Sequence, residues 1–222
     1  MYRRLVMGLA LVALAAAGPV AAQQFEIGPR LGYVKWKTET GLTNAAMLGV
    51  DATYRVNSVI GVGVRFDFAR PGTDGAYFPA EMTFGGDTTL IFAVSQPVTV
   101  MQYGVQARAE FGGAFGFFAK GGAGGRTFTL DPQASFGRVS VTDWMFTAGA
   151  GVRFRAGGGT SISLEVQDLI YPNFARESLN PVEPRFRPTR FPDVVPVQPE
   201  FDGTAHNIYA AIAFTFTPGG GR

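Results

Sequence analysis

The chain has 222 residues, with 19 Lys and Arg, 17 Asp and Glu, a single His and no Cys. The lack of Cys excludes disulfides and thiol chemistry. Arg3 and Arg4 precede an apolar run that ends in small residues, which predicts a cleaved signal peptide over 1–22. Without that peptide, 17 basic residues face 17 acidic ones, so the charge gives no support for nucleic-acid binding.

The apolar run at 5–17 is shorter than the roughly 20 residues that a membrane-spanning helix needs. No later segment is long and apolar enough either, so any membrane insertion would be by strands. The chain contains 30 Gly and 20 Phe and shows almost no helical periodicity, which indicates an all-β protein. We expect one domain, a β-barrel over 23–217, followed by a short extension at 218–222.

The stretch 98–111 shows the pattern around which the rest of the chain is organised. Apolar residues such as Tyr103 and Val105 occupy one face of a two-residue period, and Arg108 and Glu110 occupy the other, together with Gly and Gln. A polar face of this kind is typical of a transmembrane barrel strand, which turns its apolar face to lipid and its polar face to a lumen.

The pattern recurs along the chain and predicts eight strands. In chain order they span 25–37, 46–56, 59–69, 98–111, 114–129, 139–154, 161–171 and 206–216. In the first strand the alternation slips near Val34 and Trp36, which predicts a bulge or the exit of the strand from the bilayer. Aromatic residues near strand ends are candidates for interfacial girdles, although ordinary strand packing explains each of them equally well. The candidates are Tyr33, Trp36, Tyr54, Tyr103, Trp144 and Tyr171.

The predicted connections alternate in length. Short turns follow the second, fourth and sixth strands, at 57–58, 112–113 and 156–159. The long connection at 70–97 predicts a hairpin around Gly85 and Gly86 that extends its flanking strands beyond the membrane. Another, at 172–203, holds seven prolines and cannot form a central strand. Bacterial outer-membrane barrels are built in this way, with short periplasmic turns and long extracellular loops.

The last predicted strand ends in Phe214, Thr215 and Phe216, an aromatic-x-aromatic ending. Together with the eight alternating strands, this ending makes 23–217 similar to the small OmpA/OmpX-type outer-membrane barrels. The resemblance implies an all-β fold, a transmembrane up-and-down antiparallel barrel of eight strands in the bacterial outer membrane. It also implies contact with outer-membrane lipid and lipopolysaccharide, and recognition of Phe214 and Phe216 by the outer-membrane insertion machinery. The family is functionally diverse, so architecture transfers more safely than activity.

Many charged residues fall on the inward faces of the predicted strands. They are Arg30, Asp51, Arg55, Arg65, Asp67, Arg108, Glu110, Lys120, Arg126, Arg153, Arg155 and Glu165. The interior of an eight-stranded barrel is just wide enough for side chains to fill, and charges held there must pair. We therefore expect a network of salt bridges that plugs the lumen. The alternative is a narrow passage rimmed by cations, because the bases in this set outnumber the acids.

The sequence offers little for catalysis or metal binding. His206, at the start of the last strand, is the only plausible catalytic base, and no nucleophile or phosphate-binding motif accompanies it. Asp74, Glu81 and Asp87 in the connection at 70–97 lack the spacing of a calcium loop, so we interpret them as solvated loop residues. We predict no enzyme activity, no cofactor and no metal.

The last long connection contains a distinctive stretch, 184–192. Its Arg and Phe residues are Arg185, Phe186, Arg187, Arg190 and Phe191. These side chains suit contact with lipopolysaccharide phosphates or with another protein. Equally, the prolines of the stretch suit a stiff loop that folds over the mouth of the barrel.

The sequence thus predicts a non-enzymatic envelope protein that acts structurally or by surface interaction, through its extracellular loops. One rival is a small passive channel, and another is a lipid-modifying enzyme at the barrel rim. A third is a secreted lipocalin-like barrel, which would hold its apolar residues inside and its polar residues outside.

Overall fold

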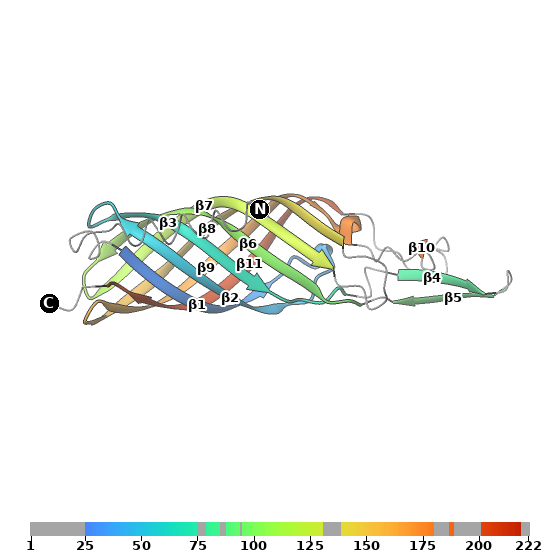
Figure 1. Ribbon diagram of the computed structural model, residues 1–222, viewed down its shortest axis with the longest axis horizontal. Helices are drawn as coiled ribbons and strands as arrows, with labels where there is room; N and C mark the ends of the chain where they lie inside the picture. Colours follow the sequence, from blue (N-terminus) through green and yellow to red (C-terminus); the bar gives the residue numbers. More distant parts are fainter. Residues whose placement is uncertain are drawn as a thin grey trace, which may run out of the picture.

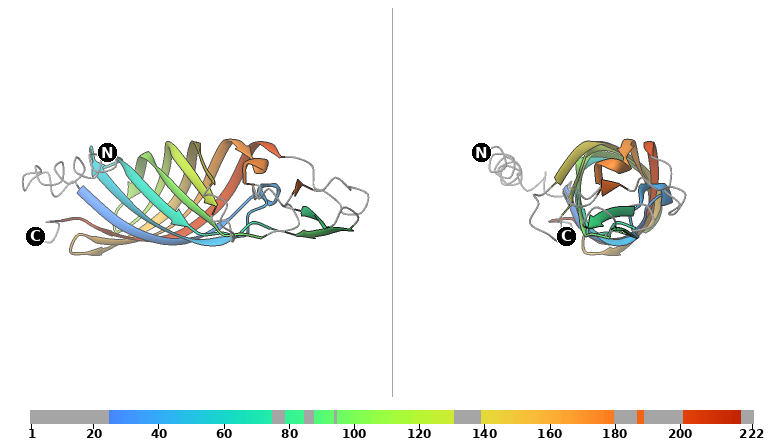
Figure 2. Two further views of the ribbon diagram at one scale, coloured as in Figure 1. Left: turned by 45° about the vertical axis from the view of Figure 1, so that its right-hand side comes forward. Right: turned by 90° about the vertical axis from the view of Figure 1, so that its right-hand side faces the viewer.

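The computed structural model describes residues 25–74, 79–84, 88–93, 95–130, 139–179, 187–188 and 201–218. Within these residues the chain forms a closed, all-antiparallel barrel of eight strands, and this confirms the predicted fold class. The barrel strands are β1 (Phe25–Lys35), β2 (Ala45–Arg55), β3 (Ile60–Ala69), β6 (Val98–Gly112), β7 (Phe115–Leu130), β8 (Val139–Gly157), β9 (Thr160–Ala175) and β11 (Asp202–Phe216). Viewed along its axis, the barrel is a closed ring (Figure 2).

Neighbouring strands of the barrel follow one another along the chain, and β1 closes the ring by pairing with β11. The ring has two distinct ends. At the turn end lie the connections 56–59, 113–114 and 158–159, together with the start of β1 and the end of β11. At the loop end lie the ends of β1, β3, β7 and β9 and the starts of β2, β6, β8 and β11, together with residues 36–44, 70–74, 95–97 and 176–179.

The loop end carries additional structure. Two short 3-10 helices, η1 (Thr38–Thr40) and η3 (Arg176–Leu179), follow β1 and β9. Beyond this end of the barrel lies a separate sheet, in the order β10 (Arg187–Pro188), β4 (Pro79–Phe84) and β5 (Thr88–Ala93), as Figure 1 shows. No helix in the described part of the chain has the length and apolar character needed to cross a membrane.

Side chains alternate strictly across the barrel wall. The outward face carries exposed Leu, Val, Ile and aromatic residues on every strand; Val105, for example, is 62% exposed. The inward face carries the buried charged residues. A soluble protein rarely exposes so much contiguous apolar surface, whereas a transmembrane barrel presents it to lipid. Because the apolar residues lie outside and the charged ones inside, this arrangement rules out the lipocalin-like alternative.

The first predicted strand needs a correction, because β1 contains no bulge. Its register with β2 and β11 is continuous as far as Val34, and Val34 and Trp36 keep the inward direction of Arg30. The polar–apolar alternation of the sequence ends here because the inward residues become apolar near the loop end. For the same reason Trp36 and Tyr171 are buried inside the barrel and are not girdle residues, whereas Trp144 is 72% exposed on the outside.

Several predicted boundaries also differ from the structure, among them the start of the last strand, which is at Asp202 and not at His206, and two of these differences have a clear physical reason. Strand β9 continues through Pro172 to Ala175, although 172–203 was expected to lack central strand. Beyond Ile170, β9 pairs with β11 alone, and the register shifts between Gly203 and Ala205, so the missing amide of Pro172 is tolerated. The first turn comprises 56–59 and not two residues, because Asn57 Oδ1 accepts hydrogen bonds from the amides of residues 59 and 60.

Candidate functional site

The candidate site is the lumen, whose inward side chains form three successive groups along the axis. We call the one nearest the turn end the turn-end cluster. It consists of Glu26, Arg55, Arg108, Glu110, Arg153 and Arg155. Its members come from the beginning of β1 and from the ends of β2, β6 and β8, which all reach the turn end. The up-and-down topology therefore brings together charges that are far apart in the sequence.

Glu110 is the centre of the turn-end cluster. Its carboxylate accepts hydrogen bonds from four guanidinium groups, those of Arg55, Arg108, Arg153 and Arg155. The other carboxylate, Glu26, accepts from Arg55 and, at 3.0 and 3.2 Å, from two nitrogens of Arg153. Hydrogen bonds between charged groups are stronger than neutral ones, so this cluster ties four barrel strands to one another.

The second group, the central cluster, lies near the middle of the barrel. It consists of Arg30, Asp51, Arg65, Asp67, Lys120 and Glu165. Arg30 is fully buried and donates to Asp67, to Asp51 at 3.1 Å and to Glu165 at 3.5 Å. Asp67, equally buried, holds Arg30 with one oxygen and Arg65 with the other. Each charge in the cluster thus has opposite charges as neighbours, as burial requires.

The remaining hydrogen bonds of the central cluster involve β7 and β9. Lys120 Nζ lies 2.6 Å from Glu165 Oε2, and Gln167 donates at 2.7 Å to the other oxygen of Glu165. Gln167 in turn accepts from Arg65 at 2.7 Å. Gly49 makes room for this network, because a Cβ there would lie 2.1 Å from Asp67 Oδ1 and 2.7 Å from Arg30 Nε. The central cluster therefore depends both on its paired charges and on the absence of a side chain at Gly49 on β2.

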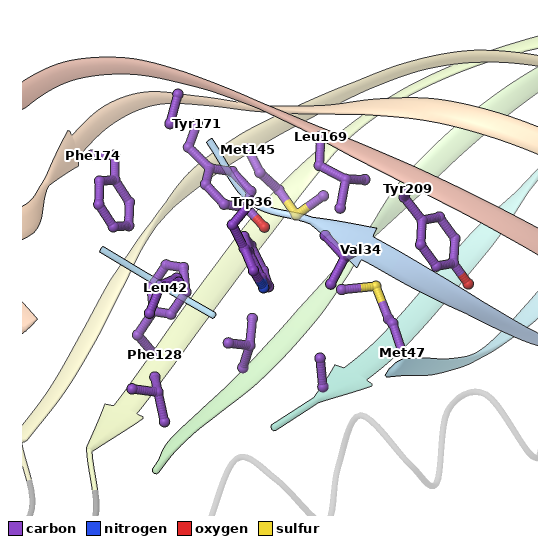
Figure 3. Packing of buried hydrophobic residues seen from close by; sticks show 14 of the residues in the cluster. Val34, Trp36, Leu42, Met47, Phe128, Met145, Leu169, Tyr171, Phe174 and Tyr209 are labelled. Atoms are coloured by element: carbon purple, nitrogen blue, oxygen red, sulfur yellow. The ribbon is translucent and has the colours of Figure 1, made fainter. Parts of the chain in front are cut away.

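The third group, the apolar cluster, fills the lumen near the loop end, as Figure 3 shows. It includes Val34, Trp36, Leu42, Met47, Phe128, Met145, Leu169, Tyr171, Phe174 and Tyr209. The rings of Trp36, Phe128 and Tyr171 lie with their centroids about 6 Å apart, in tilted and edge-to-face arrangements. This part of the lumen resembles the core of a soluble protein.

One cation lies within the apolar cluster. Arg126 is buried, and its guanidinium carbon is 4.5 Å from the ring centroid of Tyr171 and about 5 Å from those of Phe128 and Phe174. It also donates to Asp143 at 3.3 Å and to the carbonyl of Asn173 at 3.1 Å. Aromatic faces attract a desolvated cation, so Arg126 is stabilised mainly by rings and less by counter-charges.

Among the cavities that border the charged clusters, two bear on the function. A small one, about 20 Å³, lies between the turn-end and central clusters, beside Arg108, Lys120 and Glu165, and has room for about one water molecule. The other, about 540 Å³, forms the mouth of the barrel at the turn end. Arg55, Arg153 and Arg155 line this mouth.

The comparisons with known proteins agree with this geometry. A family model described as an outer membrane protein beta-barrel domain matches residues 7–181. The chain belongs to this family. It is therefore a protein of the bacterial outer membrane, and its exposed apolar face is the surface that contacts lipid.

Several solved structures are similar to this chain, and the first of them shares its fold. The chain is similar to Neisserial surface protein A (NspA), with 10% identity and a TM-score of 0.55 over 87% of this chain and 97% of that one. It also matches Ail, the attachment invasion locus protein of Yersinia pestis, with 12% identity and a TM-score of 0.42 over 86% and 96% of the two chains. The N-terminal β-barrel domain of Pseudomonas aeruginosa OprF matches with 11% identity and a TM-score of 0.41 over 87% of this chain and 98% of that one. No match was found among curated proteins.

The structure brings together all nine residues predicted as the lumen charge network, in two separate clusters. Asp51, Arg65, Asp67, Lys120 and Glu165 meet in the central cluster, and Arg55, Arg108, Glu110 and Arg153 meet in the turn-end cluster. Sequence reasoning missed Glu26, although it shares the inward face of Arg30. It also missed the apolar cluster, whose signal was the apolar inward residues at the loop-end side of the strands.

The predicted interaction loop is described only in part. Arg187 lies in β10 and pairs with Glu81 of β4, so the structure joins the connections 70–97 and 176–201 in one small sheet. Arg185, Phe186, Arg190 and Phe191 lie outside the described residues. The pairing of Phe84 with Thr88 matches the hairpin that the sequence predicts. The turn of this hairpin, 85–87, lies outside the described residues. The hairpin belongs to its own sheet and does not prolong the barrel strands.

The other candidates lie on the outside or at the loop end. His206 faces outward, and its Nδ1 lies 2.6 Å from Asp168 Oδ2 on β9. Phe214 and Phe216 also face outward and are 54% and 52% exposed. Among the described residues no group of acids and His could hold a metal ion, and Asp87 falls outside them.

Proposed function

We propose that this protein is a non-enzymatic, non-conducting outer-membrane barrel whose lumen is filled by its own side chains and which interacts with its surroundings at the loop end. The observation that supports a filled lumen is the succession of the turn-end, central and apolar clusters along the axis. An ion on this path would have to separate buried salt bridges and then cross a region packed with aromatic rings. Both steps are costly in a low-dielectric interior.

Single-channel recording in planar lipid bilayers tests this proposal. We expect no steady conductance from refolded protein whose insertion is shown by circular dichroism and protease protection. A porin reconstituted in the same bilayers provides the positive control. Steady, salt-dependent openings that change when Arg108 or Arg153 is replaced by Gln would refute the filled lumen and make the protein a channel.

The non-enzymatic part of the proposal rests on the surroundings of His206. Its only hydrogen-bond partner among the described side chains is Asp168, and no Ser or Thr hydroxyl within those residues is hydrogen-bonded to it. A base and an orienting carboxylate without a hydroxyl nucleophile leave a catalytic group missing. We expect no acyl transfer or lipid hydrolysis in purified outer-membrane lipid. Activity that disappears in a His206→Gln variant would contradict this.

The loop-end interaction is supported by the sheet beyond the barrel. In the described residues β5 pairs with β4 on one side only, and its sequence, from Thr88 to Ala93, has no charged residue. Such an edge suits addition of a strand from a protein partner. The Arg residues of the loop suit lipopolysaccharide phosphates. Binding to vesicles with and without lipopolysaccharide tests the second idea: simultaneous replacement of Arg185, Arg187 and Arg190 by Gln should weaken binding, and unchanged binding would contradict it.

The outward aromatic pair at the end of β11 completes the proposal. Phe214 and Phe216 are exposed on the lipid-facing surface, where an insertion machinery can reach them during assembly. We expect Phe216→Ala to slow assembly in cells more than it slows refolding into detergent. Equal slowing in both settings would assign Phe216 a purely structural role.

A further inference from the structure

The two charged clusters of the lumen differ in their charge balance. The central cluster has three cations and three carboxylates, so it is neutral. The turn-end cluster has four guanidinium groups, on Arg55, Arg108, Arg153 and Arg155, but only two carboxylates. It therefore carries an excess of two positive charges among the described residues. An excess of this kind in a partly desolvated place attracts an anion from outside the protein.

The turn-end cluster is also short of hydrogen-bond acceptors. One oxygen of Glu110, Oε2, accepts from Arg55, Arg108 and Arg153 at 2.7, 2.7 and 2.8 Å. The Nε atom of Arg108 is buried without a hydrogen-bond partner. Two further acceptors serve the cluster, since Arg153 Nε donates to Ser161 Oγ at 2.7 Å and Arg155 to the carbonyl of Gly113 at 2.9 Å. Four guanidinium groups still carry more N–H donors than these acceptors and the two carboxylates can satisfy. The cluster therefore has donor capacity to spare as well as positive charge.

This excess lies beside open space. The mouth cavity of about 540 Å³ is lined by Arg55, Arg153 and Arg155, with Glu26 as its one acidic residue. Arg155 has 37% of its side chain exposed, and Arg55 has 20%. The rest of the lining is neutral: Ser58, Gly112, Gly157, Gly158, Gly159, Thr160 and Thr217. A soluble anion can thus reach the guanidinium groups along the barrel axis, without passing through the lumen.

We propose that the mouth at the turn end is a binding site for a phosphoryl group on a soluble, multiply charged anion. Guanidinium groups bind phosphate oxygens in pairs, and the hydroxyls of Ser58 and Thr217 supply further donors at the rim. The excess of two positive charges matches the charge of a phosphate monoester. The site is lined by inward residues and by turns. A lipid headgroup carries the same phosphoryl chemistry, but it can enter the site only from the rim of the barrel. The inference does not depend on whether the lumen conducts.

Thermal unfolding of the full barrel in a zwitterionic detergent tests the site, with inorganic pyrophosphate as the probe and potassium chloride of equal ionic strength as the reference. A ligand that binds the folded state raises the unfolding midpoint in a saturable way. We expect this rise for the wild-type protein. Arg155→Gln, which removes an exposed guanidinium, should weaken the apparent affinity about tenfold, the loss of one charged hydrogen bond. Arg155→Lys, which keeps the charge but loses the paired donors, should lie between the two.

Arg70→Gln is the matched control, because it removes an exposed Arg at the loop end. It should leave the affinity for pyrophosphate unchanged. Pyrophosphate that acts no differently from chloride would overturn the proposal, as would equal weakening by Arg155→Gln and Arg70→Gln. A second set of titrations in phosphatidylcholine and phosphatidylglycerol nanodiscs identifies the source. If pyrophosphate raises the unfolding midpoint in phosphatidylcholine nanodiscs but not in phosphatidylglycerol nanodiscs, the site binds a lipid phosphate and the proposal of a soluble anion is overturned. If the midpoint rises in both, the site binds a soluble phosphate.

Discussion

Replacing Lys120 by Met removes one of the three cations of the central cluster. Its Nζ lies 2.6 Å from Glu165 Oε2 and 3.8 Å from Asp51 Oδ2, and the side chains of Lys120 and Glu165 are 5% and 3% exposed. The variant leaves three carboxylates facing two guanidinium groups in a site with little water. Breaking a buried pair by removing one partner costs about 3–5 kcal/mol, because the other charge stays buried without compensation. We expect Lys120→Met to lower the free energy of unfolding by this amount.

The double variant Lys120→Met, Glu165→Gln distinguishes charge from packing. It restores equal numbers of cations and carboxylates, and Gln keeps the shape of Glu165 and its contact with Gln167. We expect the double variant to recover to within about 1 kcal/mol of the wild-type protein. As a control, Lys37→Met removes a cation from a partly exposed pair with Glu39 and from the face of the Phe201 ring, which together are worth about 1–2 kcal/mol.

Equilibrium unfolding by urea in phospholipid vesicles measures these differences. Tryptophan fluorescence is a suitable signal, because Trp36 is buried in the lumen and Trp144 faces lipid. A loss below about 1 kcal/mol for Lys120→Met would show that water solvates the central cluster. Additive losses in the double variant would show that Lys120 and Glu165 do not depend on each other. Either result would refute the reasoning.

Three further changes test other parts of the lumen by urea unfolding, followed by far-UV circular dichroism. Trp36→Ala should cost about 3–5 kcal/mol because it opens a cavity in the apolar cluster, whereas Trp144→Ala on the lipid face should cost much less; equal losses would contradict the burial of Trp36. Gly49→Ala should cost about 1–3 kcal/mol because its Cβ would collide with the Arg30–Asp67 pair, whereas Gly203→Ala, which has no atom within 4 Å, should be nearly neutral. Arg126→Met should lower the free energy of unfolding less than Lys120→Met does, because Asp143 is 37% exposed and water can solvate its carboxylate once the guanidinium is removed. A larger loss would mean that the packing of the aromatic rings requires the guanidinium of Arg126.

Much of the barrel could be predicted from the sequence because alternation is a local property. In 98–111, the direction of Tyr103 and Val105 to the outside, and of Arg108 and Glu110 to the inside, follows from a period of two alone. The same reasoning placed all nine lumen charges on the inward face. It failed at Val34 and Trp36, where inward residues are apolar and the pattern was interpreted as a change of phase.

The partners of each charge could not be predicted in this way. Glu110 meets Arg153 across the lumen, and Arg30 meets Asp67 from two strands away, because the registers of all eight strands fix the depth of each residue along the axis. The union of β10 with β4 is likewise a contact between two connections that are distant in the sequence. Such depths and contacts depend on long-range pairing, for which a local pattern holds no information.

The sequence by itself determined that the chain is an eight-stranded barrel with lipid outside and charges inside, since side-chain alternation and turn residues act over a few positions. Only the tertiary structure decided how those charges are shared: a neutral central cluster, a turn-end cluster with two cations in excess, and an apolar loop end. The reason is geometric. Closing the barrel sets the relative height of strands that are far apart along the chain, and that height decides which side chains meet.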